Sequence, residues 1–283
     1  MIFDIRYTTE YRYRGAVTDS MNALRVRPAT TASQSRRGFS LATTPDARVY
    51  EHDDYFGTTV HEFEVLQPHE SLLIDVHAQV ETTPPTSHPD PTWDELASPG
   101  CRDAAAEFLY AGMPTPAGSQ VESLANEVRA ERPLATALAL TDLVPDRFAY
   151  RSGVTYVGST VADFLAAGAG VCQDFVHLGL LIFRRLGIAA RYCSGYLFVD
   201  GGTGWESAEV ETHAWLEVFL PIVGGTGVWV GVDPTNRGFV NQNHVKIGHG
   251  RSYSDVPPIK GIFRGPAGGD LTAKVTMTAV PAP

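Results

Sequence analysis

The sequence predicts an α+β protein in two parts, a small all-β domain over residues 1–83 and a mixed core over residues 95–283. Three observations support this class. The first eighty or so residues alternate apolar and polar side chains, a proline-rich stretch follows, and the remainder shows helical spacing before three apolar, strand-like segments. The length of 283 residues fits roughly two domains of about 150 residues each.

Alternation with a period of two marks the opening region. Over residues 2–14, Phe3, Ile5, Tyr7 and Tyr11 share one face and polar or charged side chains occupy the other, so this face is expected to form the domain core. Four more segments, set apart by glycine, proline and aspartate, also favour strands: residues 23–29, 38–44, 47–68 and 71–82. This spacing predicts a small antiparallel sandwich or barrel.

Four prolines between residues 84 and 91 separate the two parts. Proline removes a backbone donor and fixes φ, so this stretch is expected to link domains rather than to form a helix or strand. A domain boundary is therefore expected near residues 82–95.

The second part reads as helices followed by strands. Helical segments are expected first and strands after them: helices over residues 101–112, 119–150, 161–170 and 172–187, then strands over 188–200, 211–221 and 227–235. Ser119 with Glu122 resembles a capping box, and Ser159 or Thr160 could cap the third helix. The fourth helix is strongly apolar and is expected to stop at Gly187. The last forty residues, rich in glycine and proline, predict loops and one or two edge strands.

Charge and hydropathy disfavour two broad classes of function. The chain has 22 Lys+Arg against 32 Asp+Glu, a formal net charge of -10, and no basic run, which disfavours nucleic-acid binding. No stretch approaches the roughly 18 apolar residues of a membrane helix, so no membrane partner is expected. The N-terminus lacks the apolar core of a secretory signal, and we expect a cytoplasmic location.

Cys172, His213 and Asp233 stand apart because of where the predicted elements place them. Cys172 follows a glycine-rich turn at the start of the apolar helix, where free N–H groups and the helix dipole stabilise a thiolate. His213 lies on an apolar strand, and Asp233 ends the next strand before Pro234. These residue types can supply a nucleophile, a base that returns the proton to a leaving amine, and a carboxylate that fixes the tautomer of the base.

Three blocks of this sequence resemble the core of the transglutaminase-like superfamily of papain-type thiol enzymes: GAGVCQDFVHLGLLIFRRLGIAARYCSGYL, ETHAWLEVFLP and GVWVGVDPTN. The opening region, with RYTTEYRY and LRVRP, is similar to the N-terminal domain that precedes this core in bacterial members. The resemblance implies a papain-like core in which Cys172 is the nucleophile, His213 the histidine and Asp233 the aspartate of a catalytic triad.

The resemblance further implies acyl transfer on amide bonds through a thioester, with a peptide or protein substrate and with no metal or organic cofactor. We place hydrolysis, as by a cysteine peptidase or amidase, ahead of transamidation to an amine, because nothing in the sequence marks a tunnel that would exclude water. A non-catalytic binding or scaffolding module is the alternative from another class. Three intact triad positions argue against it.

Other cysteines and histidines have simpler interpretations. Three cysteines are too few for a disulfide framework, so we expect Cys101 to be inert and Cys193 to belong to the core. His177 lies five residues after Cys172, about 140° around a helix, so it is expected to point away from the thiol and to serve packing.

Three histidines at eight-residue intervals, His61, His69 and His77, are expected at the surface, since no tight metal-ligand motif accompanies them. Trp215 follows His213 by two residues and is expected on the same side of its strand, beside the imidazole or in the acyl pocket. Tyr196 fits either the cleft or the core.

Overall fold

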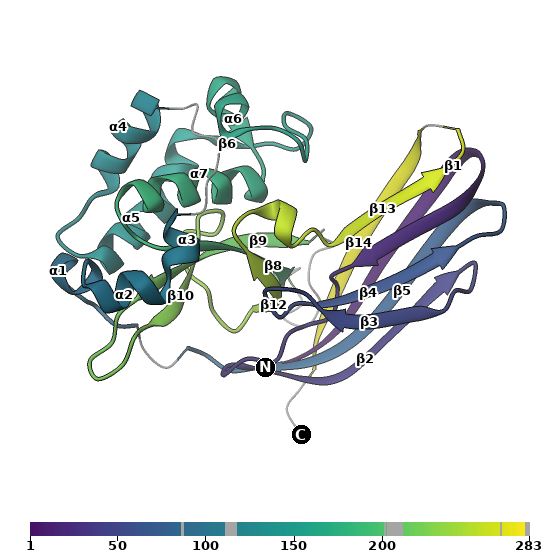
Figure 1. Cartoon of the computed structure of the whole chain (residues 1–283), viewed down its shortest axis with the longest axis horizontal. Coiled ribbons are helices and arrows are strands. Elements are labelled where there is room, and N and C mark those ends of the chain that lie inside the picture. The colour runs from purple at the N-terminus through teal and green to yellow at the C-terminus, as the bar shows by residue number, and fades with distance from the viewer. Residues whose placement is uncertain (86–87, 111–117, 201, 203–211, 267, 281–283) are drawn as a thin grey trace.

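The chain folds into a β lobe and a mixed lobe, and the predicted α+β class is confirmed (Figure 1). The computed structural model describes all residues except 86–87, 111–117, 201, 203–211, 267 and 281–283. Within that described part, every helix is too short or too polar to cross a lipid bilayer.

Antiparallel strands make up the β lobe. These strands are β1 (Ile2–Leu24), β2 (Gln34–Thr44), β3 (Val49–Asp53), β4 (Thr59–Val65), β5 (His69–Thr82), β13 (Ile259–Arg264) and β14 (Gly269–Val280). Their order is β2-β5-β1-β4-β3, and β13 and β14 also pair with β1. The segment expected over residues 47–68 is a hairpin, because the Asp54 carboxylate accepts the N–H groups of Phe56 and Thr58 and closes a turn between β3 and β4.

The long strand β1 organises the whole lobe. Its first half pairs with β5 and β14, and its second half pairs with β4 and β13. Its register shifts between Arg12 and Val17, so the strand changes direction between the two halves. Side chains from both halves share one apolar core, and the lobe is therefore sandwich-like, as the alternation predicts.

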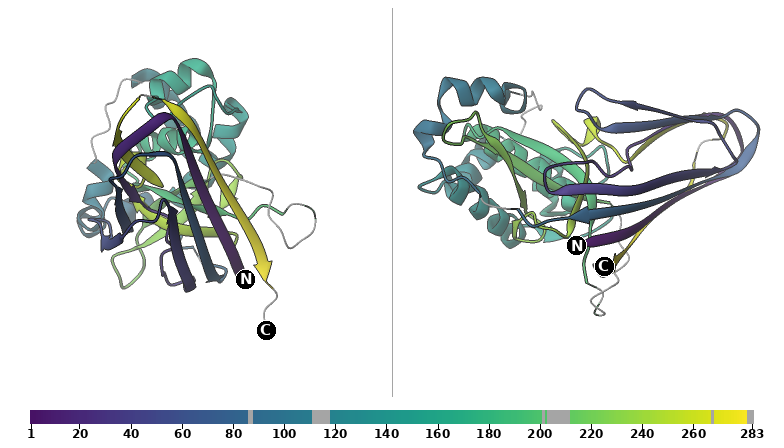
Figure 2. Two further views of the ribbon diagram at one scale, coloured as in Figure 1. Left: turned by 90° about the vertical axis from the view of Figure 1, so that its right-hand side faces the viewer. Right: turned by 90° about the horizontal axis from the view of Figure 1, so that it is seen from below.

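The C-terminal strands β13 and β14 belong to the β lobe, whereas the sequence-based division assigns them to the second domain, residues 95–283. Strand β14 pairs with β1 from Ile2 opposite Val280 to Tyr13 opposite Gly269, and the two strands lie side by side in Figures 1 and 2. Val275 and its alternate neighbours are buried in the same core. The β lobe is thus built from both ends of the chain.

The mixed lobe contains the remaining elements. Its helices are α1 (Trp93–Leu96), α2 (Pro99–Ala104), α3 (Ala106–Tyr110), α4 (Gly118–Val128), α5 (Pro133–Arg147), α6 (Val161–Ala167) and α7 (Cys172–Arg185), with a 3-10 turn, η1 (Tyr253–Asp255). Its strands are β6 (Ala149–Tyr150), β7 (Ala169–Gly170), β8 (Ala190–Leu197), β9 (His213–Leu220), β10 (Val228–Asp233), β11 (Gly238–Phe239) and β12 (His244–Gly250). Five of these strands form one sheet in the order β11-β10-β9-β8-β12.

Helix α7 is the centre of the mixed lobe, where the sequence predicts a buried helix. It packs against β8 and β9, and Gly179 permits the contact, because a Cβ there would lie 2.5 Å from Leu216 Cδ1. The chain leaves the helix through Gly187 at φ +78°, a conformation that glycine adopts without strain.

Two of the expected helices are broken. Residues 119–150 contain α4, α5 and the short strand β6, and the helices are separate because Pro133 cannot continue a helix and instead begins the second one. Ser119 lies inside α4, which begins at Gly118, so the expected capping box is wrong there. The expected helix over residues 101–112 is split between α2 and α3, and residues 111–112 lie outside the described residues.

The cap at the third expected helix is confirmed at one of its two candidates. Thr160 Oγ1 accepts the N–H of Asp163 at 3.2 Å, while the Asp163 carboxylate accepts the N–H of Thr160 at 2.8 Å. This capping box satisfies two free donors and begins α6 beside the turn that leads to Cys172.

The two lobes meet through a shared apolar core and direct hydrogen bonds. Tyr196 on β8 is 1% exposed, and its hydroxyl donates to the carbonyl of Val26 at 2.8 Å, which places it in the core rather than in a cleft. The Gln34 side chain bonds the N–H and carbonyl of Lys246 at 2.8 and 2.7 Å. These contacts hold the β lobe against β8 and β12.

Candidate active site

Cys172 is the first residue of α7, as the sequence predicts. The turn before it is fixed by Asp174, whose carboxylate accepts the N–H of Val171 at 2.8 Å and the hydroxyl of Thr155 at 2.6 Å. Gly170 is required there, since a Cβ would lie 2.5 Å from the Asp174 carboxylate. The half-buried thiol therefore sits at the positive end of the helix dipole.

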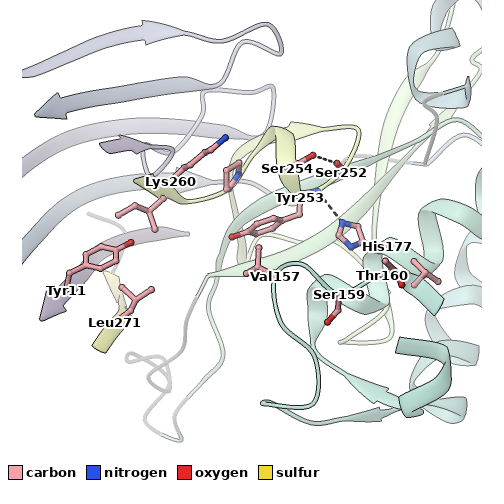
Figure 3. Close-up of a pocket in the computed structure, with 13 residues that line it drawn as sticks. Tyr11, Val157, Ser159, Thr160, His177, Ser252, Tyr253, Ser254, Lys260 and Leu271 are labelled. Atoms are coloured by element: carbon pink, nitrogen blue, oxygen red, sulfur yellow. Dashed lines mark hydrogen bonds between the residues drawn. The ribbon is translucent and has the colours of Figure 1, made fainter. Parts of the chain in front are cut away.

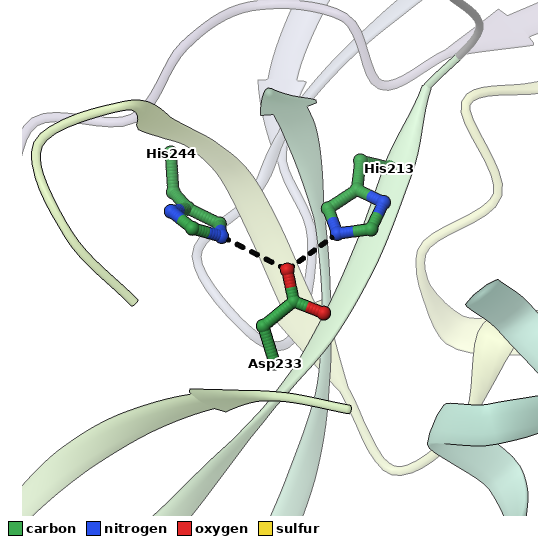
Figure 4. Close-up of side chains that lie close together, drawn as sticks. All are labelled: His213, Asp233 and His244. Carbon is green, nitrogen blue, oxygen red and sulfur yellow. Dashed lines mark hydrogen bonds and ion pairs between the residues drawn. The ribbon is translucent and has the colours of Figure 1, made fainter. Parts of the chain in front are cut away.

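His213 and Asp233 lie together at one edge of the mixed-lobe sheet. His213 begins β9 and Asp233 ends the antiparallel neighbour β10, so the two strands bring them to the same edge. His213 Nε2 is 2.8 Å from Asp233 Oδ2, and both side chains are buried (Figure 4). Because Nε2 faces the carboxylate, Nδ1 is the ring nitrogen left for another partner.

Asp233 is surrounded by donors. Its Oδ1 accepts the N–H of Thr235 at 2.8 Å, and its Oδ2 accepts the Asn236 side-chain amide at 2.7 Å. His244 Nε2 lies 3.0 Å from the same Oδ2, opposite His213 (Figure 4). Burial alone would raise the pKa of Asp233, but the hydrogen bonds from the two histidines lower it far below its usual value. The carboxylate is thus held ionised.

The tautomer of His244 follows from its other hydrogen bond. His244 Nδ1 accepts the backbone N–H of Asn241 at 3.2 Å, so the ring proton belongs on Nε2, where it points at Asp233. His244 is therefore a donor that stabilises the charge of Asp233 and makes this carboxylate a weak base. A weak base leaves the proton on His213, the other donor to Oδ2.

The imidazolium form of His213 is strongly favoured. Burial opposes the charge, but the Asp233 carboxylate and the nearby Cys172 outweigh it and raise the pKa of His213 to about 10. The structure thus places Cys172 and His213 in the wall of one cavity and joins His213 to Asp233 by a hydrogen bond.

His213, Asp233 and His244 also form the geometry of a possible metal site, since one ligand atom of each lies within 4.8 Å of the others. A metal would need both imidazole nitrogens free of their protons. Here the two Nε2 atoms share one carboxylate oxygen, and the tautomer of His244 puts a proton on its Nε2. The donor set fits a hydrogen-bonded network, and we assign it no metal.

A cavity of about 240 Å³ opens in front of Cys172. The loop before α6, the start of α7, the strands β8 and β9 and the segment after β12 all contribute to its wall. The wall includes Thr155, Val157, Cys172, Asp174, Tyr192, Ser194, His213 and Tyr253. Burial raises the pKa of Tyr192 well above 10, and the nearby Cys172 adds to this shift. The phenol therefore stays protonated in the cavity wall.

The other two cysteines lie away from this network. Cys101 and Cys193 are 6% and 0% exposed, and burial raises the pKa of each thiol, in Cys193 to about 12. Cys101 lies in the apolar core, Cys193 is buried beside Glu217, and both thiols stay protonated.

His177 and Trp215 serve packing. The His177 ring packs on Tyr192 with ring centroids 5.4 Å apart, and its Nε2 accepts the N–H of Tyr253 at 3.2 Å. Burial lowers the pKa of His177 to about 4, so the ring is neutral at pH 7. The Trp215 ring lies 6.2 Å from that of His213, on the same side of the strand, as the sequence predicts.

The expectation of three surface histidines is wrong for two of them. His61 and His69 are 3% and 7% exposed. Alternation on β4 turns His61 inward with Phe63, whereas His69 lies beyond the register shift between β1 and β5, opposite Val17. The His61 ring stacks on Phe39 with centroids 5.0 Å apart. His77 alone is exposed, and it pairs with Asp4 at 2.7 Å. The three rings form no common metal cluster within the described chain.

Sequence reasoning missed His244 and the role of Asn236. Asn236 stands three residues after Asp233, in the block GVWVGVDPTN, where a local turn could have indicated the contact. His244 gives no such signal. It begins β12, on the far side of β8 from His213, and only the sheet order brings it to Asp233.

Together, the fold and the cleft define a two-lobed α+β protein with a thiol-enzyme core. The chain belongs to the transglutaminase-like superfamily. Residues 122–234 match the model of the transglutaminase-like superfamily, and residues 3–81 match the bacterial transglutaminase-like N-terminal region. The expected family is thereby confirmed.

Individual relatives align with most of the chain. An uncharacterized protein of Mycobacterium leprae is 34% identical over 278 residues, covering 96% of each chain. One from Mycobacterium tuberculosis is 34% identical over 274 residues, covering 92% of this chain and 87% of its own. A solved structure of a proposed cysteine protease from Cytophaga hutchinsonii superposes with a TM-score of 0.73 at 23% identity, covering 100% of this chain and 92% of that one, and it supports the fold.

Proposed function

We propose that this protein transfers acyl groups from amide bonds through a thioester on Cys172. The observation that carries the proposal is the place of His213, which lines one cavity with Cys172 while its Nε2 lies 2.8 Å from Asp233. A thiol, an imidazole and a carboxylate in this order perform nucleophilic catalysis.

The steps of the proposed acyl transfer follow from the charges of Cys172, His213 and Asp233. The Cys172 thiolate attacks the carbonyl carbon of the amide, and the resulting oxyanion lies near the N–H groups that begin α7. The His213 imidazolium gives a proton to the leaving nitrogen, the C–N bond breaks, and an acyl thioester forms. Neutral His213 then takes a proton from water, hydroxide attacks the thioester, and the acid leaves as the thiolate is restored. Asp233 stays ionised throughout, because its donors disfavour protonation.

Hydrolysis remains ahead of transamidation, and a peptide or protein amide remains the expected substrate. The cavity of about 240 Å³ gives both water and a small amine access to the sulfur, and water is far more concentrated. The solved relative from Cytophaga hutchinsonii is described as a proposed cysteine protease, which agrees with this order.

Whether water or an amine is the preferred acceptor can be tested by measuring how the acyl group divides between the free acid and the amine adduct. The protein is incubated with a fluorogenic peptide amide and with a glutamine peptide, each in the presence of a labelled primary amine, and the products are separated by mass. We expect free acid to exceed the amine adduct, with Cys172→Ala giving neither product. Adduct without acid would reverse the order of the two reactions. Peptide binding with no product from any amide or ester would favour the scaffolding alternative.

A further inference from the structure

A second cavity, of about 600 Å³, lies between the two lobes. We call it the interlobe pocket. The β lobe contributes Tyr11, Ile259, Lys260 and Leu271 to its wall, and the mixed lobe contributes Val157, Thr160, His177 and Tyr253 (Figure 3). Both ends of the chain are needed to form it, since Tyr11 is on β1 and Leu271 is on β14.

The interlobe pocket adjoins the cleft that contains Cys172. Val157 and Tyr253 line both cavities. His177, in the wall of the interlobe pocket, follows Cys172 by five residues on α7, which is about 7.5 Å along a helix axis. An extended peptide advances about 3.3 Å per residue, so this rise, together with the turn of about 140° around the helix, corresponds to roughly two or three residues.

Large apolar side chains face water at this place. Val157 is 64% exposed and Leu271 is 55% exposed, and both line the pocket. Exposed apolar groups that gather around a cavity mark a binding site more strongly than the same groups scattered over a surface. Tyr11 lies on the face of β1 that is expected to form the core, and it also lines the interlobe pocket.

The charge of the pocket is simple. Lys260 is the one charged side chain in its described wall. His177 is neutral, as its low pKa and the hydrogen bond that it accepts from Tyr253 agree in showing. A neutral apolar group can therefore enter without losing an ion pair, whereas a basic group would meet the Lys260 ammonium.

We propose that the interlobe pocket binds a large apolar side chain, aromatic or aliphatic, that lies two or three residues from the scissile amide of a peptide substrate. This inference rests on the proposed function and adds to it a substrate class and a task for the β lobe. Both lobes contribute to the wall of the interlobe pocket, so the pocket requires the β lobe to be fixed against the mixed lobe.

Binding is measured on the Cys172→Ala protein, so that no turnover intervenes. Blocked heptapeptide amides carry one variable residue, Phe, Ala, Lys or Glu, two or three positions from a central glutamine on either side, and titration calorimetry gives each dissociation constant. Burying the phenyl ring predicts that the better-placed Phe peptide binds about tenfold or more tightly than its Ala counterpart. The Lys peptide is expected to bind more weakly than the Glu peptide, and Lys260→Glu to reverse that order.

Leu271→Gln tests the wall, and Leu66→Gln is its control, because Leu66 is similarly exposed at 57% and lies outside both cavities. Leu271→Gln should remove most of the preference for Phe, while Leu66→Gln should retain it. Tyr11→Ala provides a second variant on the opposite strand. Equal preference for Phe in all of these variants, or none in the parent protein, would overturn the proposal.

The same peptides separate this inference from the proposed function. If the wild-type protein cleaves all of them without a preference for Phe, the pocket proposal fails and acyl transfer stands. If the Phe peptide binds in the interlobe pocket but no peptide or ester is turned over, acyl transfer fails and the pocket stands.

Discussion

Cys172→Ala is expected to lower kcat/KM by about 10⁴-fold or more. The substitution removes the sulfur that shares a cavity wall with His213, and no oxygen or nitrogen replaces it. Alanine is a good helix former at the first position of α7, so the free energy of unfolding should change by about 1 kcal/mol or less. Steady-state kinetics and urea unfolding check the two expectations.

Cys101→Ala is the matched control. Its thiol is buried in α2, away from the cleft, so the variant should keep its activity and lose a little stability. If Cys172→Ala retained activity within tenfold of the wild type, or if Cys101→Ala lost it equally, the sulfur of Cys172 could not be the nucleophile.

His213→Ala is expected to be nearly as severe, with a loss of roughly 10³- to 10⁴-fold. The change removes both the proton donor to the leaving nitrogen and the cation beside the thiolate. The fold should survive, because Asp233 keeps the donors Thr235, Asn236 and His244 after the ring is gone. Circular dichroism of the variant should therefore match that of the wild type while activity is lost.

Asp233→Asn tests the same pair through its pH profile. The imidazolium of His213 is the form that gives up a proton, and its pKa of about 10 means that activity is held below that pH and falls above it. Removing the Asp233 charge lowers this pKa, so the alkaline fall in kcat/KM should move to lower pH. The control is His77→Gln at the exposed ion pair with Asp4, where the profile should not move. An unchanged alkaline fall in Asp233→Asn would show that the carboxylate does not govern His213.

The sequence predicted most of the elements that carry the site. A strongly apolar run that follows GAG and stops at Gly187 can form little other than a buried helix, and α7 begins at Cys172 accordingly. The two strands that hold His213 and Asp233 are short apolar runs between clear breaks. Local patterns thus determined where each of these three side chains would stand along its own element.

What the sequence could not show depends on contacts between distant segments. His244 reaches Asp233 through the order of the sheet, which no local periodicity encodes. The pairing of β14 with β1 joins residues at opposite ends of the chain, and the interlobe pocket exists only once that pairing is made. His61 and His69 were placed outside because a polar residue at a strand position does not reveal which face is covered.

The central claim is that the Cys172 sulfur at the start of α7 is the nucleophile and acts beside the His213 imidazolium. Alkylation by iodoacetamide at neutral pH, followed on each cysteine peptide by mass spectrometry, measures this most directly. Cys172 should react much faster than Cys101 and Cys193 in the folded wild-type protein, and its rate should drop in His213→Ala while theirs stay the same. A Cys172 that reacts no faster than the other two, or at the same rate with and without His213, would contradict the account.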